Sequence, residues 1–181
     1  VMTARAVGAG RRNETGAVLR RGLSYSAWLG LGSGALLALF GPLFLGSLGL
    51  KDGLAEGAAI PMIVFSLSLP VYAVSVALTF WLEGLAKPGP GAVFMWLANI
   101  VNLAANLVLV PGTFGLPALG ATGGAWSTFI ARSALLLALA IYVLRMKEAR
   151  DLGVFDKPAR DRPAEIEQRR SKLLDAIAAA E

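Results

Sequence analysis

The chain of 181 residues contains no cysteine and no histidine, and only 16% of its residues are charged. Without cysteine it has no disulfide framework and no thiolate metal site. Without histidine it lacks the usual general base and the commonest metal ligand. A soluble domain carries roughly a quarter charged residues, so the shortage of charge, together with a hydrophobic share of 56%, indicates a membrane protein.

Four apolar runs are long enough to cross the hydrocarbon layer as helices, which takes about 20 residues each. They cover residues 23–48, 57–82, 91–110 and 119–144. The runs are too long for strands, and short segments rich in glycine or proline separate them, as expected between antiparallel helices. The sequence therefore predicts an all-α integral membrane protein with four transmembrane helices within residues 1–150.

Basic residues gather on one side of the predicted spans. They are Arg5, Arg11, Arg12, Arg20, Arg21, Lys87, Arg145, Lys147 and Arg150. The other side carries only Lys51, next to Asp52. The positive-inside rule therefore predicts a multi-pass protein of the inner (plasma) membrane with both termini in the cytoplasm. Basic residues that flank apolar spans also favour anionic membrane lipids, rather than nucleic acid, as partners.

The end of the chain changes to mixed charge. Residues 151–163 are predicted to form a polar linker, and "PAEIEQRRSKLLDAIAAAE" is typical of an amphipathic helix in the cytosol or on the membrane surface. A solvated charged tail is the plainer interpretation of the same residues. We assign residues 1–150 to the transmembrane segment and residues 151–181 to a cytoplasmic linker and tail.

The second predicted span carries a stripe of polar residues on one helical face, because their spacings are 4, 3, 4 and 4. They are Ser68, Tyr72, Ser75, Thr79 and Glu83. Ionisable groups at membrane depth usually face a bundle interior or a water-filled path. Glu83 therefore has two interpretations, the mouth of a polar path or an ion pair with Lys87. The pair would contribute about 0.3–0.5 kcal/mol, and the proline after Lys87 weakens it.

Polar side chains also share one face of each later span. Asn99, Asn102 and Asn106 follow the spacing i, i+3, i+7, with Asn102 near the middle of its span. Such residues either hydrogen-bond between helices or line a hydrated cavity. Thr128 and Arg132 share a face of the fourth span. Arg132 is the single cation deep in a span, and the sequence leaves open whether its partner is a carboxylate, a lipid phosphate or a set of backbone carbonyls.

Two long motifs resemble the multidrug and toxic compound extrusion (MATE) transporters. "EGLAKPGPGAVFMWLANIVNLAANLVLVPGTFGLPALGATGGAWST" resembles the fourth to sixth helices of that family. Upstream, "ARAVGAGRRNETGAVLRRGL" is similar to the stretch between the family's second and third helices. The asparagine pair followed by G-x-P-x-L-G-x-x-G resembles the N-terminal lobe of the NorM-like branch. The resemblance covers about residues 4–155.

The resemblance implies a cation-coupled antiporter of twelve helices in two lobes. It would use H⁺ or Na⁺ and no other cofactor, and it would export small cationic or amphipathic compounds. Asn102 and Asn106 would match the cation or proton site of the N-terminal lobe, and Thr128 a polar residue of the same cavity. Glu83 would match an acidic position in the turn after the fourth helix. The predicted substrate or ion pathway comprises Glu83, Asn102, Asn106, Asn99, Thr79, Thr128 and Arg132.

The chain departs from the family pattern by lacking the first two helices, with their aspartate, and the whole second lobe. We therefore expect a part of the N-terminal lobe that needs the missing helices as partners. A non-transporting four-helix scaffold or accessory subunit is the alternative, although it needs no aligned polar faces. An integral membrane enzyme would need clustered acids, histidines or a metal site, and Glu83 alone is too little. The prediction is a transporter segment, not an enzyme.

Overall fold

The computed structural model describes residues 2–49 and 53–156, and this part of the chain contains helices and no strands. The elements are α1 (Met2–Gly8), η1 (Arg12–Glu14), α2 (Thr15–Ser47), α3 (Leu54–Gly84), α4 (Pro88–Leu109), α5 (Gly120–Arg145) and η2 (Lys147–Ala149). Helices α2 to α5 are long and apolar enough to cross a membrane. The all-α fold with four membrane-spanning helices is confirmed, whereas the predicted amphipathic helix lies outside the described residues.

The helices extend beyond the apolar runs where polar residues continue the helical pattern. Helix α2 begins at Thr15, well before the predicted start at residue 23, because the intervening arginines are good helix formers. Helix α3 begins at Leu54, directly after Gly53, whose φ of 72° lies in the left-handed region that suits glycine. Hydropathy alone marks the membrane-embedded part of a helix and not its ends.

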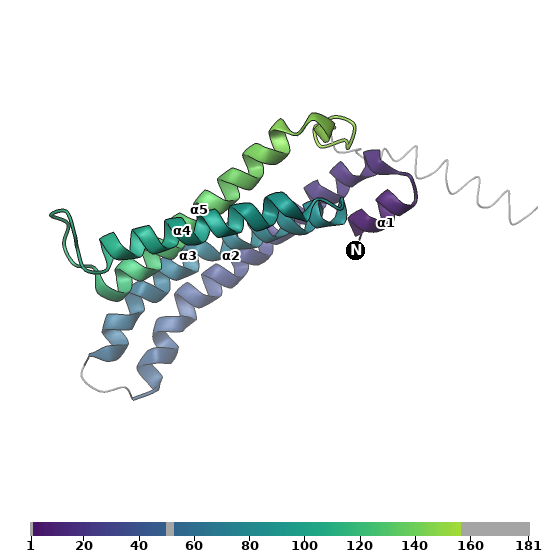
Figure 1. The fold of residues 1–181 in the computed structure, drawn as a ribbon. Coiled ribbons are helices and arrows are strands. Elements are labelled where there is room, and N and C mark those ends of the chain that lie inside the picture. Colours follow the sequence, from purple (N-terminus) through teal and green to yellow (C-terminus); the bar gives the residue numbers. More distant parts are fainter. Residues whose placement is uncertain (1, 50–52, 157–181) are drawn as a thin grey trace, which may run out of the picture.

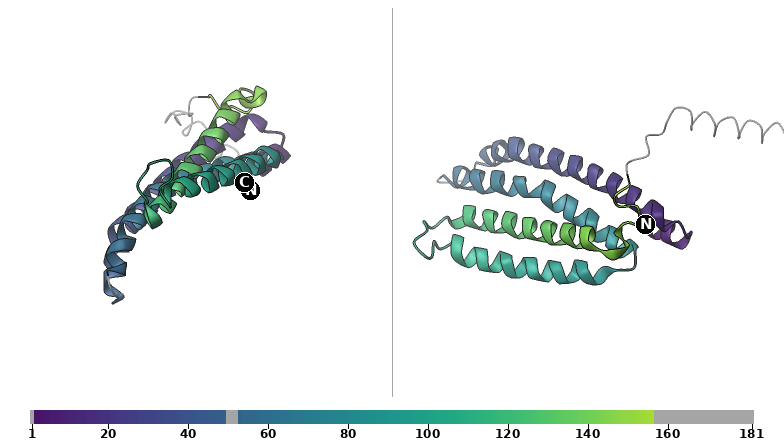
Figure 2. Two further views of the ribbon diagram at one scale, coloured as in Figure 1. Left: turned by 60° about the vertical axis from the view of Figure 1, so that its left-hand side comes forward. Right: turned by 90° about the horizontal axis from the view of Figure 1, so that it is seen from above.

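The four long helices form a single layer in which chain order and spatial order differ. Helix α2 packs against α3, α3 against α5, and α5 against α4, while α3 and α4 touch only slightly. Figure 2 (right) shows this row, with α5 in green between α3 in blue and α4 in teal. Polar residues on α3, α4 and α5 can therefore meet on one side of α5.

Helices α2 and α3 approach closely because glycines on α2 face a proline on α3. A Cβ atom on Gly30 would lie 2.5 Å from Pro70 Cα, and one on Gly34 would lie 2.8 Å from the Ser66 carbonyl oxygen. Pro70 has no N–H, so it cannot complete the helical hydrogen bond to the Ser66 carbonyl. The glycine surface of α2 covers this part of α3, which explains how a proline is accommodated inside a long helix.

The main hydrophobic core lies toward the end of the layer that carries α1 and η2 (Figure 1). Trp81 is 3% exposed, and its indole N–H donates a hydrogen bond to the Thr15 carbonyl at 2.9 Å. Leu152 is also buried here, and the Gly16 N–H bonds to its carbonyl at 2.7 Å. Residues 151–156, which the sequence analysis placed in the linker, therefore pack as a turn against the start of α2. Arg20 fastens this turn through the Gly153 carbonyl at 2.6 Å.

Most of the apolar surface of the helices remains outside the core. Trp28 and Trp96 are each 73% exposed, and the neighbouring faces carry further leucines and phenylalanines. Apolar patches of this size are rare on soluble monomers and mark membrane or protein contacts. The layer therefore requires lipid or additional helices on its faces.

Candidate functional site: a polar cavity beside Arg132

A cavity of about 350 Å³ lies between α3, α4 and α5, and five polar residues from the three helices line it. They are Tyr72, Asn99, Asn102, Thr128 and Arg132, and the rest of the wall is Met95, Ala98, Ala131 and Leu135. Four of the seven predicted pathway residues thus share one cavity. The insertion of α5 between α3 and α4 produces this meeting, since those residues are far apart in the sequence.

Arg132, in the middle of α5, is held by a three-residue cradle on α3. Its Nη1 donates a hydrogen bond to Ser68 Oγ at 2.5 Å. Its Cζ lies 4.7 Å from the centre of the Phe65 ring and 4.6 Å from the centre of the Tyr72 ring. The three cradle residues follow spacings of 3 and 4 along α3, so they face one way.

The cradle explains how the chain tolerates an arginine within a membrane span. Insertion measurements place the cost of a charged residue at a helix centre at about 2.5–3.5 kcal/mol. A cation–π contact contributes about 0.5–1 kcal/mol at an exposed site and about 2 kcal/mol when it is desolvated, and a hydrogen bond to a charged group contributes about 1.5–3 kcal/mol. Two rings and one hydroxyl are therefore sufficient to offset the cost. The sequence left open a carboxylate, a lipid phosphate or backbone carbonyls as the partner of Arg132. The observed contacts are instead a serine hydroxyl and two aromatic rings.

The two asparagines of α4 form a local pair. Asn106 Nδ2 donates to Asn102 Oδ1 at 3.0 Å and to the Asn102 carbonyl at 2.9 Å. Asn102 lines the cavity directly, whereas Asn106 is not among its lining residues. Asn106 Oδ1 lies close to Gly124 of α5, 3.6 Å from the position that a Cβ atom on that glycine would take. Thr128 Oγ1 donates to the Gly124 carbonyl at 3.0 Å and keeps its lone pairs for the cavity side.

The polar stripe of α3 divides into two parts. Ser68 and Tyr72 contact Arg132, as described above. Ser75 and Thr79 donate to carbonyls of their own helix, Ser75 to Tyr72 at 2.8 Å and Thr79 to Ser75 at 3.0 Å. Glu83 is exposed at the end of α3 and does not line the cavity. The stripe is continuous in the sequence, but the hydroxyl groups of two of its residues, Ser75 and Thr79, donate to carbonyls of their own helix.

Lys87 pairs with Glu148 rather than with Glu83. Its Nζ lies 2.7 Å from Glu148 Oε2. The α-helical path ends before Lys87, because Ala86 has a φ of 60° and α4 begins at Pro88. The hydrogen bond and the charge of Lys87 lower the pKa of the Glu148 carboxyl from its ordinary value of 4.5. The pair fastens the α3–α4 loop to η2 at the end of the layer.

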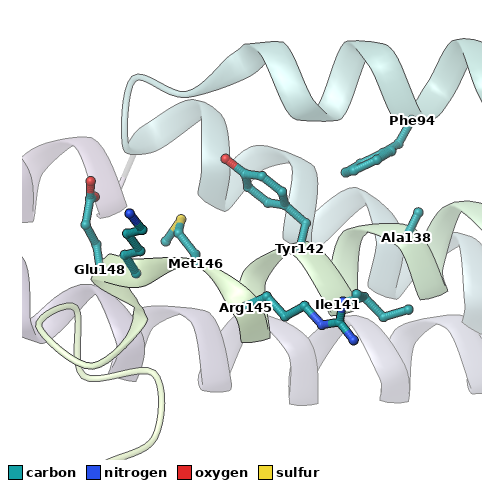
Figure 3. Close-up of a pocket in the computed structure, with 8 residues that line it drawn as sticks. Phe94, Ala138, Ile141, Tyr142, Arg145, Met146 and Glu148 are labelled. Carbon is teal, nitrogen blue, oxygen red and sulfur yellow. The ribbon is translucent and has the colours of Figure 1, made fainter.

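A second cavity, of about 560 Å³, lies near that ion pair, between α4, the end of α5 and η2 (Figure 3). Phe94 and Tyr142 pack edge to face in its wall, with ring centres 5.9 Å apart. Arg145, Met146, Lys147 and Glu148 complete the lining together with Ala138 and Ile141. This cavity contains none of the predicted pathway residues.

Sequence reasoning missed Phe65, because only polar residues were sought on α3. Its position three residues before Ser68 is the signal that could have found it, since a ring on the face of a buried cation is a usual partner. Among residues 2–49 and 53–156, no group of three or more Asp, Glu, His or Cys side chains could hold a metal ion. The ligands that the cavity offers are amide and hydroxyl oxygens.

Comparison with known proteins adds an independent line of support. The MatE family model matches residues 1–108. A "Probable multidrug resistance protein NorM" of Caulobacter vibrioides is 79% identical over 170 residues, which cover 94% of this chain and 36% of that protein. Proteins of the same name from Neisseria meningitidis serogroups A and B are 32% identical over 161 residues, or 87% of this chain and 35% of theirs. The chain spans about a third of the length of these curated relatives.

Proposed function

Because the chain belongs to the MATE family of membrane transporters, we propose that it forms part of the N-terminal lobe of a multidrug efflux antiporter driven by H⁺ or Na⁺. The observation that carries this proposal is the cavity in which Asn102 of α4 meets Thr128 and Arg132 of α5. A scaffold does not require these polar groups to line one cavity away from the core of the layer. The names of the relatives support multidrug compounds as the substrates, and the family resemblance implies that these compounds are cationic or amphipathic.

The coupling ion would use the neutral oxygens of the cavity. Asn102 and Thr128 offer an amide and a hydroxyl to Na⁺, or to a water molecule that carries a proton. Asn106 positions Asn102 through the hydrogen bond at 3.0 Å. Glu83, exposed at the end of α3, would collect protons at the mouth of the path, and Thr79 lies between it and the cavity along the same helix. Access would alternate as one lobe rocks against the other.

The arrangement of charge supports an orientation with both ends in the cytoplasm. Helix α1, the Lys87 loop and η2 lie at one end of the layer (Figure 1), and nearly all the basic residues flanking the spans are at that end. Positive charge near the ends of spans is retained on the cytoplasmic side of the inner membrane. Anionic lipid headgroups would contact these residues.

The exposed faces of the layer support the need for further helices. A transport cavity must be closed on every side except its gate, whereas this one is bounded by only three helices. The other helices of the same transporter, including the second lobe, would complete it. We therefore expect the isolated chain to carry no flux.

A chimera tests the proposal. The matching third of the Caulobacter relative is replaced by this chain, and export of a fluorescent cationic dye is followed in cells without other efflux pumps. We expect export that Asn106→Leu or Glu83→Gln reduces, with Leu107→Asn, which changes an exposed residue next to Asn106, as the control for altered polarity. Export that persists unchanged in both variants would refute the pathway assignment, and a folded chimera without export would favour the scaffold.

A further inference from the structure

The second cavity, of about 560 Å³, extends from the interior of a membrane span to its end. Its lining on α5 runs from Ala138 to Arg145, the last residue of that helix. This stretch is about 10 Å long along the helix axis. The apolar part of the wall therefore lies at the depth of the hydrocarbon, and the charged part lies at the depth of the lipid headgroups.

The outer end of this cavity is cationic. Arg145 and Lys147 line it, and both side chains are exposed. Glu148 is the one acidic residue in the lining, and Lys87 already pairs with it at 2.7 Å. Within residues 2–49 and 53–156, the other ion pair lies beside η1, so no carboxylate of this part of the chain neutralises Arg145 or Lys147. The charge at this end therefore favours an anionic ligand.

The inner wall of the cavity continues into the exposed apolar surface of α5. Leu137, Ile141 and Leu144 are exposed and follow spacings of 4 and 3, so they share one face of the helix. Ile141 also lines the cavity. A hydrocarbon chain that lies on this face of α5 can therefore enter the cavity without leaving an apolar surface.

Two aromatic rings give the opposite wall a polar side and an apolar side. Phe94 of α4 and Tyr142 of α5 pack edge to face, with ring centres 5.9 Å apart. In the view of Figure 3 the Tyr142 hydroxyl points away from Phe94, toward Met146. A phenol can donate a hydrogen bond, so this donor is directed toward the charged end of the cavity, while the Phe94 ring stays at the apolar end.

We propose that this cavity binds one anionic phospholipid, with its phosphodiester at Arg145 and Lys147 and the first part of an acyl chain against Phe94 and Ile141. Basic pockets between transmembrane helices are known to bind anionic headgroups. The arginine fork suits two phosphate oxygens, and the lysine adds a point charge. The inference concerns a site separate from the polar cavity beside Arg132, and it goes beyond the proposed transport function without depending on it.

Native mass spectrometry of the delipidated chimera tests the site. Phosphatidylglycerol and phosphatidylcholine with the same acyl chains are titrated separately, and the affinity of the first bound lipid is measured. We expect phosphatidylglycerol to bind more tightly. Arg145→Gln combined with Lys147→Gln should weaken its binding about tenfold or more, because each basic residue near a headgroup contributes about fivefold. Binding of phosphatidylcholine should change by less than about twofold.

Arg21→Gln combined with Arg150→Gln is the matched control. It removes the same charge from exposed residues at the same end of the layer, and neither residue lines the cavity. Equal weakening in the two double variants would mean diffuse attraction to the membrane surface and would overturn the proposal, as would equal binding of the two lipids by the wild type. If the first double variant does not fold, Lys147→Gln alone should weaken binding about fivefold, and an unchanged affinity would overturn the proposal.

Photocrosslinking then locates the lipid and identifies what part of it is recognised. Phosphatidylglycerol with a diazirine on its acyl chain should label Phe94, Ala138 or Ile141 in the wild type and lose this labelling in the variant of Arg145 and Lys147. Labelling spread evenly over the exposed faces of α2 to α5, or absent from this cavity because another helix fills it, would overturn the proposal. Soluble glycerophosphoglycerol at the same concentration should not displace the lipid, and displacement would mean a site for free phosphate esters instead. Dye export is not the readout, so a chimera that binds the lipid here without export would refute transport alone.

Discussion

Arg132 of α5 donates a hydrogen bond to Ser68 of α3 at 2.5 Å, and this contact joins the cavity to the helix layer. Ser68 is fully buried, and its own hydroxyl donates to the Phe65 carbonyl at 2.6 Å. One serine thus uses its donor on its own helix and its lone pair on the neighbouring one. The position of Arg132 in the cavity wall and the contact between α3 and α5 therefore both depend on Ser68 Oγ.

Ser68→Ala should lower the free energy of unfolding by about 1.5–3 kcal/mol, since it removes a hydrogen-bond acceptor from the half-buried guanidinium of Arg132. Ser66→Ala is the control, because Ser66 is buried on the same helix but donates only to the Ile63 carbonyl. Thermal unfolding of the purified chimera in detergent measures both variants. Equal destabilisation would show that the Arg132 contact contributes nothing beyond burial.

Tyr72 should act on Arg132 through its ring and not through its hydroxyl. Tyr72→Phe is expected to keep stability within about 0.5 kcal/mol of wild type, because the cation–π contact remains. Tyr72→Leu should lose about 1–2 kcal/mol through that contact. The same unfolding measurement compares them, and equal losses in the two variants would contradict the role assigned to the ring.

The glycines of α2 should differ sharply in their tolerance of a side chain. Gly34→Val places atoms against the Ser66 carbonyl, so overpacking should cost about 1–3 kcal/mol and separate α2 from α3. Gly32→Val is the control, because a Cβ atom at Gly32 meets no atom within 4 Å. A spin-label distance between α2 and α3 reads out the separation. Equal behaviour of the two variants would contradict the observed packing.

The Lys87–Glu148 pair should respond to acid. Because the pKa of Glu148 in the folded chain is lower than 4.5, the pair stabilises the fold above that ordinary value and loses this contribution as pH falls through the lowered pKa. Glu148→Gln should therefore speed hydrogen exchange in residues 147–156 at neutral pH, and the difference from wild type should vanish in acid. Identical exchange rates in Glu148→Gln and the wild type at neutral pH would contradict this role of the pair. Glu14→Gln, at the exposed Arg11–Glu14 pair, serves as the control.

The sequence predicted the elements of the fold better than their arrangement. Apolar runs longer than the hydrocarbon layer identify spans directly, and all four were recovered. Nothing in the composition of α5 indicates that it lies between α3 and α4, because several faces of each span are apolar. The resemblance to known transporters implied that Asn102 and Thr128 share a cavity, whereas their meeting with Arg132 follows from the placement of α5.

The candidate site was predicted only in part, because helical spacing shows which face a side chain shares but not which group it contacts. Helical spacing identified the polar faces of α3 and α4, but spacing does not report which hydroxyls bond to their own backbone, as Ser75 and Thr79 do. It also cannot place Lys87, whose partner Glu148 lies 61 residues away. The sequence did not identify the partners of Arg132, because two of the three, Phe65 and Tyr72, contact the guanidinium through their aromatic rings.

The most direct test of the central claim, that the cavity beside Arg132 is a water-accessible substrate path, uses the absence of cysteine from this chain. Asn102→Cys is introduced into a cysteine-free chimera, with Leu103→Cys, at an exposed apolar position of the same helix, as control. The account predicts that a membrane-impermeant thiol reagent modifies Asn102→Cys much faster than Leu103→Cys, and that a transported dye slows the reaction. Modification of Asn102→Cys at the control rate, with no protection by the dye, would contradict it.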